Sequence, residues 1–233
     1  MPYVLIHGGS FAASCWDRLV PLLPPPAHAI DLPGRGGRPR PIAGLTVADF
    51  VDAVVHDIEA SDLRDVVLVG HSLAGITMPG VAARVPDRLK RLVFVSCTVP
   101  GDGASILDEL DPEVRALAEV NALDTSGGML DEPTARAMFC AGMDDATTRF
   151  TLESMVPEAV QVTAEAVSLA GLTGPAAHVP RTWIRLDRDV VVTPAKQEAY
   201  ATRVGADILA LDAGHMAMIS HPQELATLLR PLL

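Results

Sequence analysis

Short apolar runs alternate with longer amphipathic stretches along most of the chain. The runs expected to form strands are residues 3–7, 27–32, 65–69, 91–95, 182–186 and 206–211. Runs that are this short and apolar throughout are typical of parallel strands buried on both faces. The stretches between them have the spacing of helices that cover a sheet. This alternation predicts an α/β fold with a mostly parallel sheet of about six strands covered by helices.

The clearest expected helix follows Thr46, where a capping box with Asp49 precedes apolar residues at helical spacing from Val47 to Ile58. Further helices are expected over residues 14–23, over 72–85, from Pro194 behind the N-cap Thr193, and over 222–233. Pro79 lies inside the second of these, where its missing N–H should kink the helix or shorten its first part.

The alternation lapses between residues 99 and 180, where helical patches occur without a convincing strand. We therefore expect residues 1–98 and 181–233 to form an α/β core. Residues 99–180 are expected to form a helical cap over the carboxyl edge of the sheet, inserted between two of its strands.

Composition indicates which kinds of binding partner to expect. Hydrophobic residues make up 49% of the chain, and the formal net charge is −11, which disfavours nucleic acid and anionic membranes. The uncharged stretch 66–83 contains glycines and a proline, and is better explained as a buried strand and helix than as a membrane span. We expect a small-molecule substrate, no nucleic-acid or membrane partner, and leave a homodimer open.

The three cysteines, Cys15, Cys97 and Cys140, have no C-x-x-C spacing, and no basic leader precedes the first strand. Both features predict a reducing, cytoplasmic setting. The histidines show no metal-ligand spacing, so neither a metal nor a cofactor is expected.

Candidate chemistry lies where expected strands end. Ser72 follows the central strand in Gly70-His71-Ser72-Leu73-Ala74, which differs from the nucleophile elbow G-x-S-x-G only at its last position. Asp187 and Asp189 follow the fifth strand, and His215 follows the sixth. A histidine can take the proton of an attacking serine, and a carboxylate orients that histidine. The order Ser, Asp, His is the one that α/β-hydrolases require.

The oxyanion of an acyl-transfer reaction needs backbone N–H donors. Leu73, directly after the serine, can supply one, and Gly9, in the glycine-rich loop after the first strand, can supply the other. We expect His7 and His71 to be structural, holding this loop and the elbow respectively.

The chain resembles the α/β-hydrolase family, and within it the small esterase branch that includes plant methylesterases, plant hydroxynitrile lyases and bacterial esterase-like relatives. The matching segments are 5–9, 67–72, 94–100 and 214–218. The resemblance implies the α/β-hydrolase fold and a catalytic triad of Ser72, Asp189 and His215. In the family the acid stands a few residues before a proline that opens the next helix, which favours Asp189 over Asp187 because it is nearer to Pro194.

Two positions separate hydrolysis from lyase chemistry within this branch. The lyases carry a lysine after the catalytic histidine and a threonine in the oxyanion loop, where this chain has Met216 and Gly8. We therefore expect a serine carboxylesterase that forms an acyl-enzyme in a largely apolar pocket, acting on a small apolar or aromatic ester or a lactone. The alternatives are a C–C or cyanohydrin lyase on the same triad and a slow-turnover ligand-binding protein.

Overall fold

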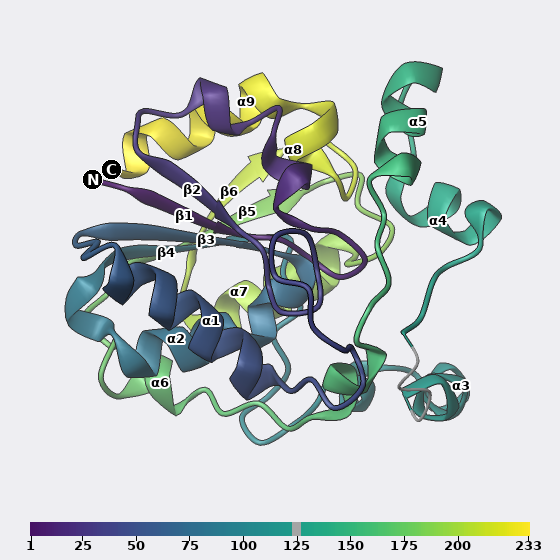
Figure 1. Cartoon of the computed structure of the whole chain (residues 1–233), viewed down its shortest axis with the longest axis horizontal. Coiled ribbons are helices and arrows are strands. Elements are labelled where there is room, and N and C mark those ends of the chain that lie inside the picture. Colours follow the sequence, from purple (N-terminus) through teal and green to yellow (C-terminus); the bar gives the residue numbers. More distant parts are fainter. Residues whose placement is uncertain (123–126) are drawn as a thin grey trace.

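One parallel sheet forms the centre of the computed structural model, which describes residues 1–122 and 127–233 (Figure 1). The order across the sheet is β2-β1-β3-β4-β5-β6, and every neighbouring pair is parallel. The strands are β1 (Tyr3–Ile6), β2 (Ala27–Ile30), β3 (Val66–His71), β4 (Leu89–Val95), β5 (Arg181–Leu186) and β6 (Asp207–Leu211). The predicted α/β class and parallel sheet are confirmed.

Both faces of the sheet are covered, which explains why its strands are apolar throughout. In β1, Val4 and Ile6 face one apolar layer, whereas Tyr3 and Leu5 face the other. The first layer is covered by α1 (Val47–Ala60), α2 (Met78–Arg84), α6 (Ala170–Thr173) and α7 (Pro194–Val204). The second is covered by α8 (Ala217–Ser220) and α9 (Pro222–Leu229) (Figure 1).

Proline explains two differences from the expected helices. Residues 14–23 form two 3₁₀ turns, Ala13–Trp16 and Val20–Leu22, because Pro21 lacks the N–H that a continuous helix would need. Residues 72–85 form a 3₁₀ helix, Ser72–Ile76, followed by α2. Pro79 stands in the first turn of α2, where its missing N–H is tolerated, so it does not kink the helix. The capping box predicted at Thr46 and Asp49 is present at the start of α1.

The connection from β4 to β5 contains α3 (Pro112–Ala122), α4 (Glu132–Phe139), α5 (Asp145–Glu153) and α6, and its described part has no strand. Helices α3, α4 and α5 lie beyond the carboxyl edge of the sheet (Figure 1). By contrast, α6 packs against α2 so tightly that a Cβ on Gly171 would come 2.2 Å from the carbonyl oxygen of Pro79. The connection therefore begins beyond the sheet edge and ends against the sheet's helical layer.

The topology places a crevice between β1 and β3. The chain leaves β1 toward β2 on one side, and it leaves β3 toward β4 on the other. Ligands bind at such switch points in open α/β sheets, outside the carboxyl ends of the strands. The loop after β1 and the turn after β3 flank this point. No helix of the described residues is both long and apolar enough to cross a bilayer.

Candidate active site

Ser72 stands on a sharp turn between β3 and the 3₁₀ helix that follows it. Its φ of 52° lies in the left-handed region, which is strained for a residue with a side chain. The turn is compact, because a Cβ on Gly70 would come 2.3 Å from the sulfur of Met78 and 3.1 Å from the Cβ of Ala74. Ala74 is not among the residues with left-handed backbone, so this position of the elbow does not require glycine.

The structure brings together Ser72, His215 and Asp189 in a chain of hydrogen bonds. Ser72 Oγ lies 3.0 Å from His215 Nε2, and His215 Nδ1 lies 2.6 Å from Asp189 Oδ2. His215 and Asp189 are buried, whereas Ser72 is partly exposed. Asp187 is not part of this group, because it is exposed and pairs with Arg185 at 2.7 Å. In this geometry His215 can take the proton of Ser72 while Asp189 orients the imidazole.

Asp189 accepts hydrogen bonds at both carboxylate oxygens. The N–H groups of Val191 and Val192 donate to Oδ1 at 2.7 and 3.0 Å, and Ser96 Oγ donates to Oδ2 at 2.5 Å. Burial raises the pKa of Asp189, but His215, Ser96 and the Val192 N–H outweigh it and bring the net pKa below its ordinary value. The sequence reasoning did not single out Ser96. Its position directly after β4 is the same signal that identified the other candidates.

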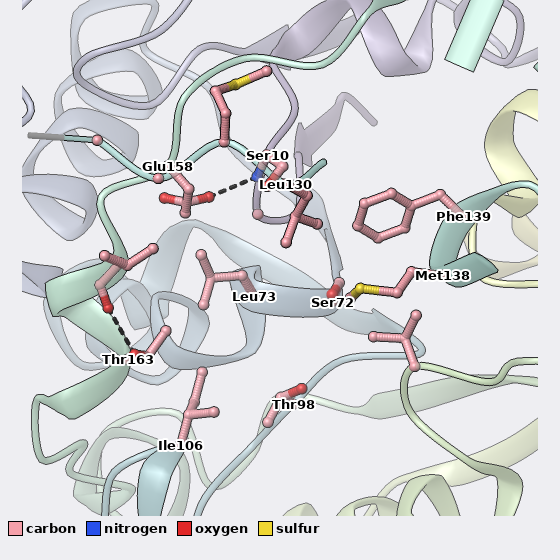
Figure 2. A pocket seen from close by; sticks show the side chains of 16 residues that line it. Ser10, Ser72, Leu73, Thr98, Ile106, Leu130, Met138, Phe139, Glu158 and Thr163 are labelled. Atoms are coloured by element: carbon pink, nitrogen blue, oxygen red, sulfur yellow. Dashed lines mark hydrogen bonds between the residues drawn. The ribbon is translucent and has the colours of Figure 1, made fainter. Parts of the chain in front are cut away.

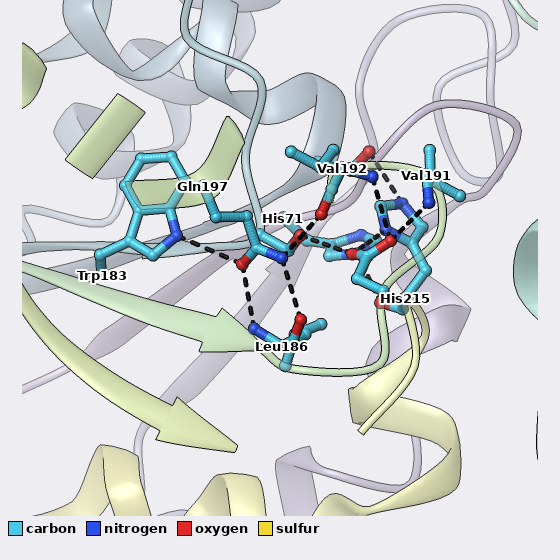
Figure 3. Close-up of polar contacts among 10 residues, drawn as sticks. His71, Trp183, Leu186, Val191, Val192, Gln197 and His215 are labelled. Atoms are coloured by element: carbon cyan, nitrogen blue, oxygen red, sulfur yellow. Dashed lines mark hydrogen bonds and ion pairs between the residues drawn. The ribbon is translucent and has the colours of Figure 1, made fainter. Parts of the chain in front are cut away.

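The loop that carries Asp189 is tied to β5 by Gln197 of α7 (Figure 3). This fully buried amide donates to the carbonyls of Leu186 and Val192 at 3.0 and 2.7 Å. Its oxygen accepts from the Leu186 N–H at 2.9 Å and from Trp183 Nε1 at 3.4 Å. All four hydrogen-bonding positions of the amide are therefore occupied. Gln197 was also missed from the sequence, since nothing local marks it as different from its neighbours on α7.

The loop after β1 is held by His7. The His7 Nδ1–H donates to the carbonyl of Gly8 at 2.8 Å, and the Leu32 N–H donates to His7 Nε2 at 3.1 Å. Burial, aided by the charge of Arg35, lowers the pKa of His7 to about 3, so the ring stays neutral. In a trans peptide the N–H points away from the carbonyl. By fixing the Gly8 carbonyl, His7 therefore fixes the direction of the Gly9 N–H.

His71 links the elbow to the base. Its Nε2–H donates to the carbonyl of His215 at 2.9 Å, and the two rings lie 4.6 Å apart. Burial, followed by the neighbouring charge of His215, lowers the pKa of His71 well below its ordinary value. A neutral His71 can then hold the His215 backbone without adding a second positive charge beside the base.

Ser72, Gly9 and Leu73 line one cavity of about 580 Å³, a volume that suits a small-molecule ligand (Figure 2). Most of the other lining side chains are apolar. They are Ile106, Met129, Leu130, Met138, Phe139, Val160 and Val191. The cavity also contains the carboxylate of Glu158, which the sequence reasoning did not single out.

A serine, a histidine and a carboxylate joined in this order at the carboxyl edge of a parallel sheet form the arrangement typical of serine hydrolases. The chain belongs to the α/β-hydrolase family, whose model, described as "Alpha/beta hydrolase family", matches residues 3–228. Within that family it is a hydrolase of the esterase type, as the resemblance of its motifs predicted.

Among curated proteins, the chain is similar to a carbendazim hydrolyzing esterase of Nocardioides sp. (strain SG-4G), with 29% identity over 99% of this chain and 98% of that protein. It is also 28% identical to the putative chloroplastic methylesterase 15 of Arabidopsis thaliana, over 57% of this chain but only 32% of that protein. Among solved structures, an extracellular α/β-hydrolase from a Paenibacillus species has a TM-score of 0.87 at 24% identity, covering 98% of this chain and 97% of that one. This likeness confirms the α/β-hydrolase fold.

Proposed function

We propose that this enzyme is a carboxylesterase that cleaves small apolar or aromatic esters, or lactones, through an acyl-enzyme on Ser72. The observation that carries the proposal is the hydrogen-bonded series from Ser72 Oγ through His215 to Asp189. It is supported by the position of Ser72 in the cavity, beside two backbone groups that can stabilise an oxyanion.

In the proposed reaction, Ser72 Oγ attacks the ester carbonyl carbon while His215 Nε2 takes the hydroxyl proton. The N–H groups of Gly9 and Leu73 bind the oxyanion, and the alcohol leaves with the proton from His215. Water then attacks the acyl-enzyme, again with His215 as the base, and releases the acid. Asp189 stabilises the imidazolium at each step. The nucleophile, the base, the carboxylate and the oxyanion donors of this scheme are all groups of the chain.

The lining of the cavity supports the proposed substrate class. Its side chains are mainly aliphatic, sulfur-containing or aromatic, which favours an apolar group next to the ester. Several of them, from Ile106 to Thr163, belong to the connection between β4 and β5. This supports the expectation that much of the 99–180 segment acts as a cap that shapes the pocket.

A lyase on the same triad is the alternative to test. Met216, which follows the base, is fully buried and cannot supply the positive charge that a departing cyanide would need. A side chain at Gly8 would place its Cβ 2.9 Å from the Cβ of Ser72, so the oxyanion loop has no space for the threonine that the lyases carry. Both observations favour hydrolysis.

The test is a substrate panel of esters, lactones, amides and mandelonitrile, assayed with the wild type and with Ser72→Ala. We expect ester or lactone turnover in the wild type, a loss of about 10⁴-fold or more in kcat for Ser72→Ala, and no cleavage of mandelonitrile. Preferred cleavage of mandelonitrile would instead support the lyase. Tight ligand binding with negligible turnover of every ester would support a binding protein.

A further inference from the structure

Glu158 is the one charged side chain among the described residues that line the cavity. It lies between α5 and the 3₁₀ turn Val160–Ala164, and only 8% of its side chain is exposed. Figure 2 shows it on the side of the cavity away from Met138 and Phe139, with Leu73 between it and Ser72. A carboxylate in this otherwise uncharged lining requires an explanation that the catalytic scheme does not provide.

Three donors from the protein hold the carboxylate in place. Arg35, which is buried and stacks over the ring of Phe50 at 5.0 Å, forms an ion pair with Oε1 but does not line the cavity. The Ala159 N–H donates to the same oxygen at 2.7 Å. The other oxygen, Oε2, accepts the Ser10 N–H at 2.7 Å. Glu158 is thus neutralised by Arg35 and fixed in one orientation toward the cavity.

Oε2 retains capacity for a further hydrogen bond. A carboxylate oxygen can accept two donors, and the Ser10 N–H is its single partner among the described residues. An acceptor left partly unpaired in an apolar cavity is unfavourable, so a ligand that supplies a donor gains affinity. Oε2 also lies beside the oxyanion loop, because a Cβ on Gly9 would come 3.0 Å from it. One molecule can therefore place its ester carbonyl at the oxyanion donors and a hydrogen-bond donor at Oε2.

We propose that Glu158 Oε2 accepts a hydrogen bond from a neutral O–H or N–H group of the substrate, so that the preferred esters are apolar molecules carrying one such donor. This inference rests on the proposed esterase function. Arg35 cancels the charge of Glu158, so a cationic substrate loses its hydration without meeting a net opposite charge. An anionic group likewise loses its hydration, and it brings no donor to Oε2.

The test uses methyl phenylacetates that differ only in one ring substituent, in both the meta and the para series. Hydroxyl supplies a neutral donor, methoxy removes it, and aminomethyl and carboxylate supply the two charges. For the wild type, we expect kcat/KM of the hydroxy ester to exceed that of the methoxy ester by about tenfold in at least one series. The two charged esters should be poorer than the hydroxy ester.

Glu158→Gln and Glu158→Leu then test the assignment. In Glu158→Gln, Arg35 and the Ala159 N–H both require the amide oxygen, which leaves the NH₂ facing the Ser10 N–H and the cavity. We expect the hydroxy-to-methoxy ratio to fall to about 1 or below in both variants. Loss of the Ser10 contact lowers kcat for both esters alike, so the ratio is insensitive to it. Thr163→Val is the matched control, since it removes a different polar group from the cavity lining, and it should keep the ratio.

The same preference should appear in binding. With Ser72→Ala as the background, Kd for the hydroxy and methoxy esters measured by calorimetry should differ in the same direction, and Glu158→Gln should remove the difference. A wild-type hydroxy-to-methoxy ratio of about 1 in both series would overturn the proposal while leaving ester hydrolysis intact. A preference for the hydroxy ester that persists in both Glu158 variants would do the same. Absence of turnover for every ester, with the donor preference still present in binding, would instead count against the proposed function alone.

Discussion

At the scale of single residues, two aspartates in one short loop have opposite surroundings. Asp189 is buried and accepts from His215, Ser96 and two backbone N–H groups. Asp187 is exposed and pairs with Arg185, itself partly exposed, a kind of contact that contributes little to stability. The donors that converge on Asp189 support our proposal that it is the acid that orients His215.

We therefore expect Asp189→Asn to lower kcat by about 10⁴-fold, because an amide stabilises the wrong tautomer of His215. Asp187→Asn is the matched control, and it should leave kcat within a factor of about 2 of the wild type. Steady-state kinetics on a shared ester substrate measure both. A larger loss in Asp187→Asn would reverse the assignment of the acid.

His7 predicts how stability depends on pH. Its pKa falls from 6.5 to about 3 on folding. Between these two pH values the imidazole is therefore protonated in the unfolded chain but stays neutral in the folded chain. This group's contribution to the free energy of unfolding is therefore lost progressively as the pH falls from about 6.5 toward 3, and the loss reaches about 2 kcal/mol at pH 5. Urea unfolding at pH 7 and pH 5 should show a smaller pH-dependent loss for His7→Asn than for the wild type.

His56→Asn provides the control, because it replaces a histidine of α1 that is exposed. Its pH-dependent loss should match that of the wild type. If His7→Asn loses as much stability between pH 7 and pH 5 as the wild type does, His7 is not the group responsible for the loss.

At the scale of elements, α7 holds the loop that carries Asp189. Gln197 joins the end of β5 to Val192, whose N–H in turn donates to Asp189. We infer that Gln197 is a positioning residue, since it touches neither the cavity nor His215. Its contribution to catalysis acts through the geometry of the loop.

Gln197→Leu should destabilise the fold by about 3 kcal/mol, because it leaves several buried backbone and side-chain groups without partners. It should also lower kcat more than it changes KM. Glu198→Gln, on the exposed face of the same helix, should change stability by less than about 0.5 kcal/mol. Urea unfolding and steady-state kinetics test both variants. A Gln197→Leu enzyme with wild-type kcat would contradict the positioning role.

Elements with a strong local pattern could be predicted from the sequence, and contacts between distant segments could not. The strands, the start of α1 and the residues after the strands follow from apolar runs, capping chemistry and parallel topology. The helix expected over residues 14–23 was wrong, because apolar spacing indicates a helix there while the missing N–H of Pro21 prevents a continuous one. Glu158 and Gln197 gave no local signal, since their importance arises from Arg35, Ser10, Leu186 and Val192, which are brought close by folding.

At the scale of the whole molecule, the fold gathers groups from both ends of the chain at one edge of the sheet. The loop after β1, the turn after β3 and the loops after β5 and β6 meet there because parallel strands end on the same side. The connection between β4 and β5 then supplies much of the apolar lining. Ser72 is the point at which all of these contributions meet, so the proposed function depends on a covalent step on its Oγ.

That step is tested most directly by intact-protein mass spectrometry after rapid acid quenching of the enzyme with p-nitrophenyl acetate. We expect a transient mass increase of one acetyl group that is absent in Ser72→Ala. After digestion of the quenched protein, the acetyl group should be found on the peptide that contains Ser72. Ester turnover without any such adduct on Ser72, or at an undiminished rate in Ser72→Ala, would contradict the proposed covalent step.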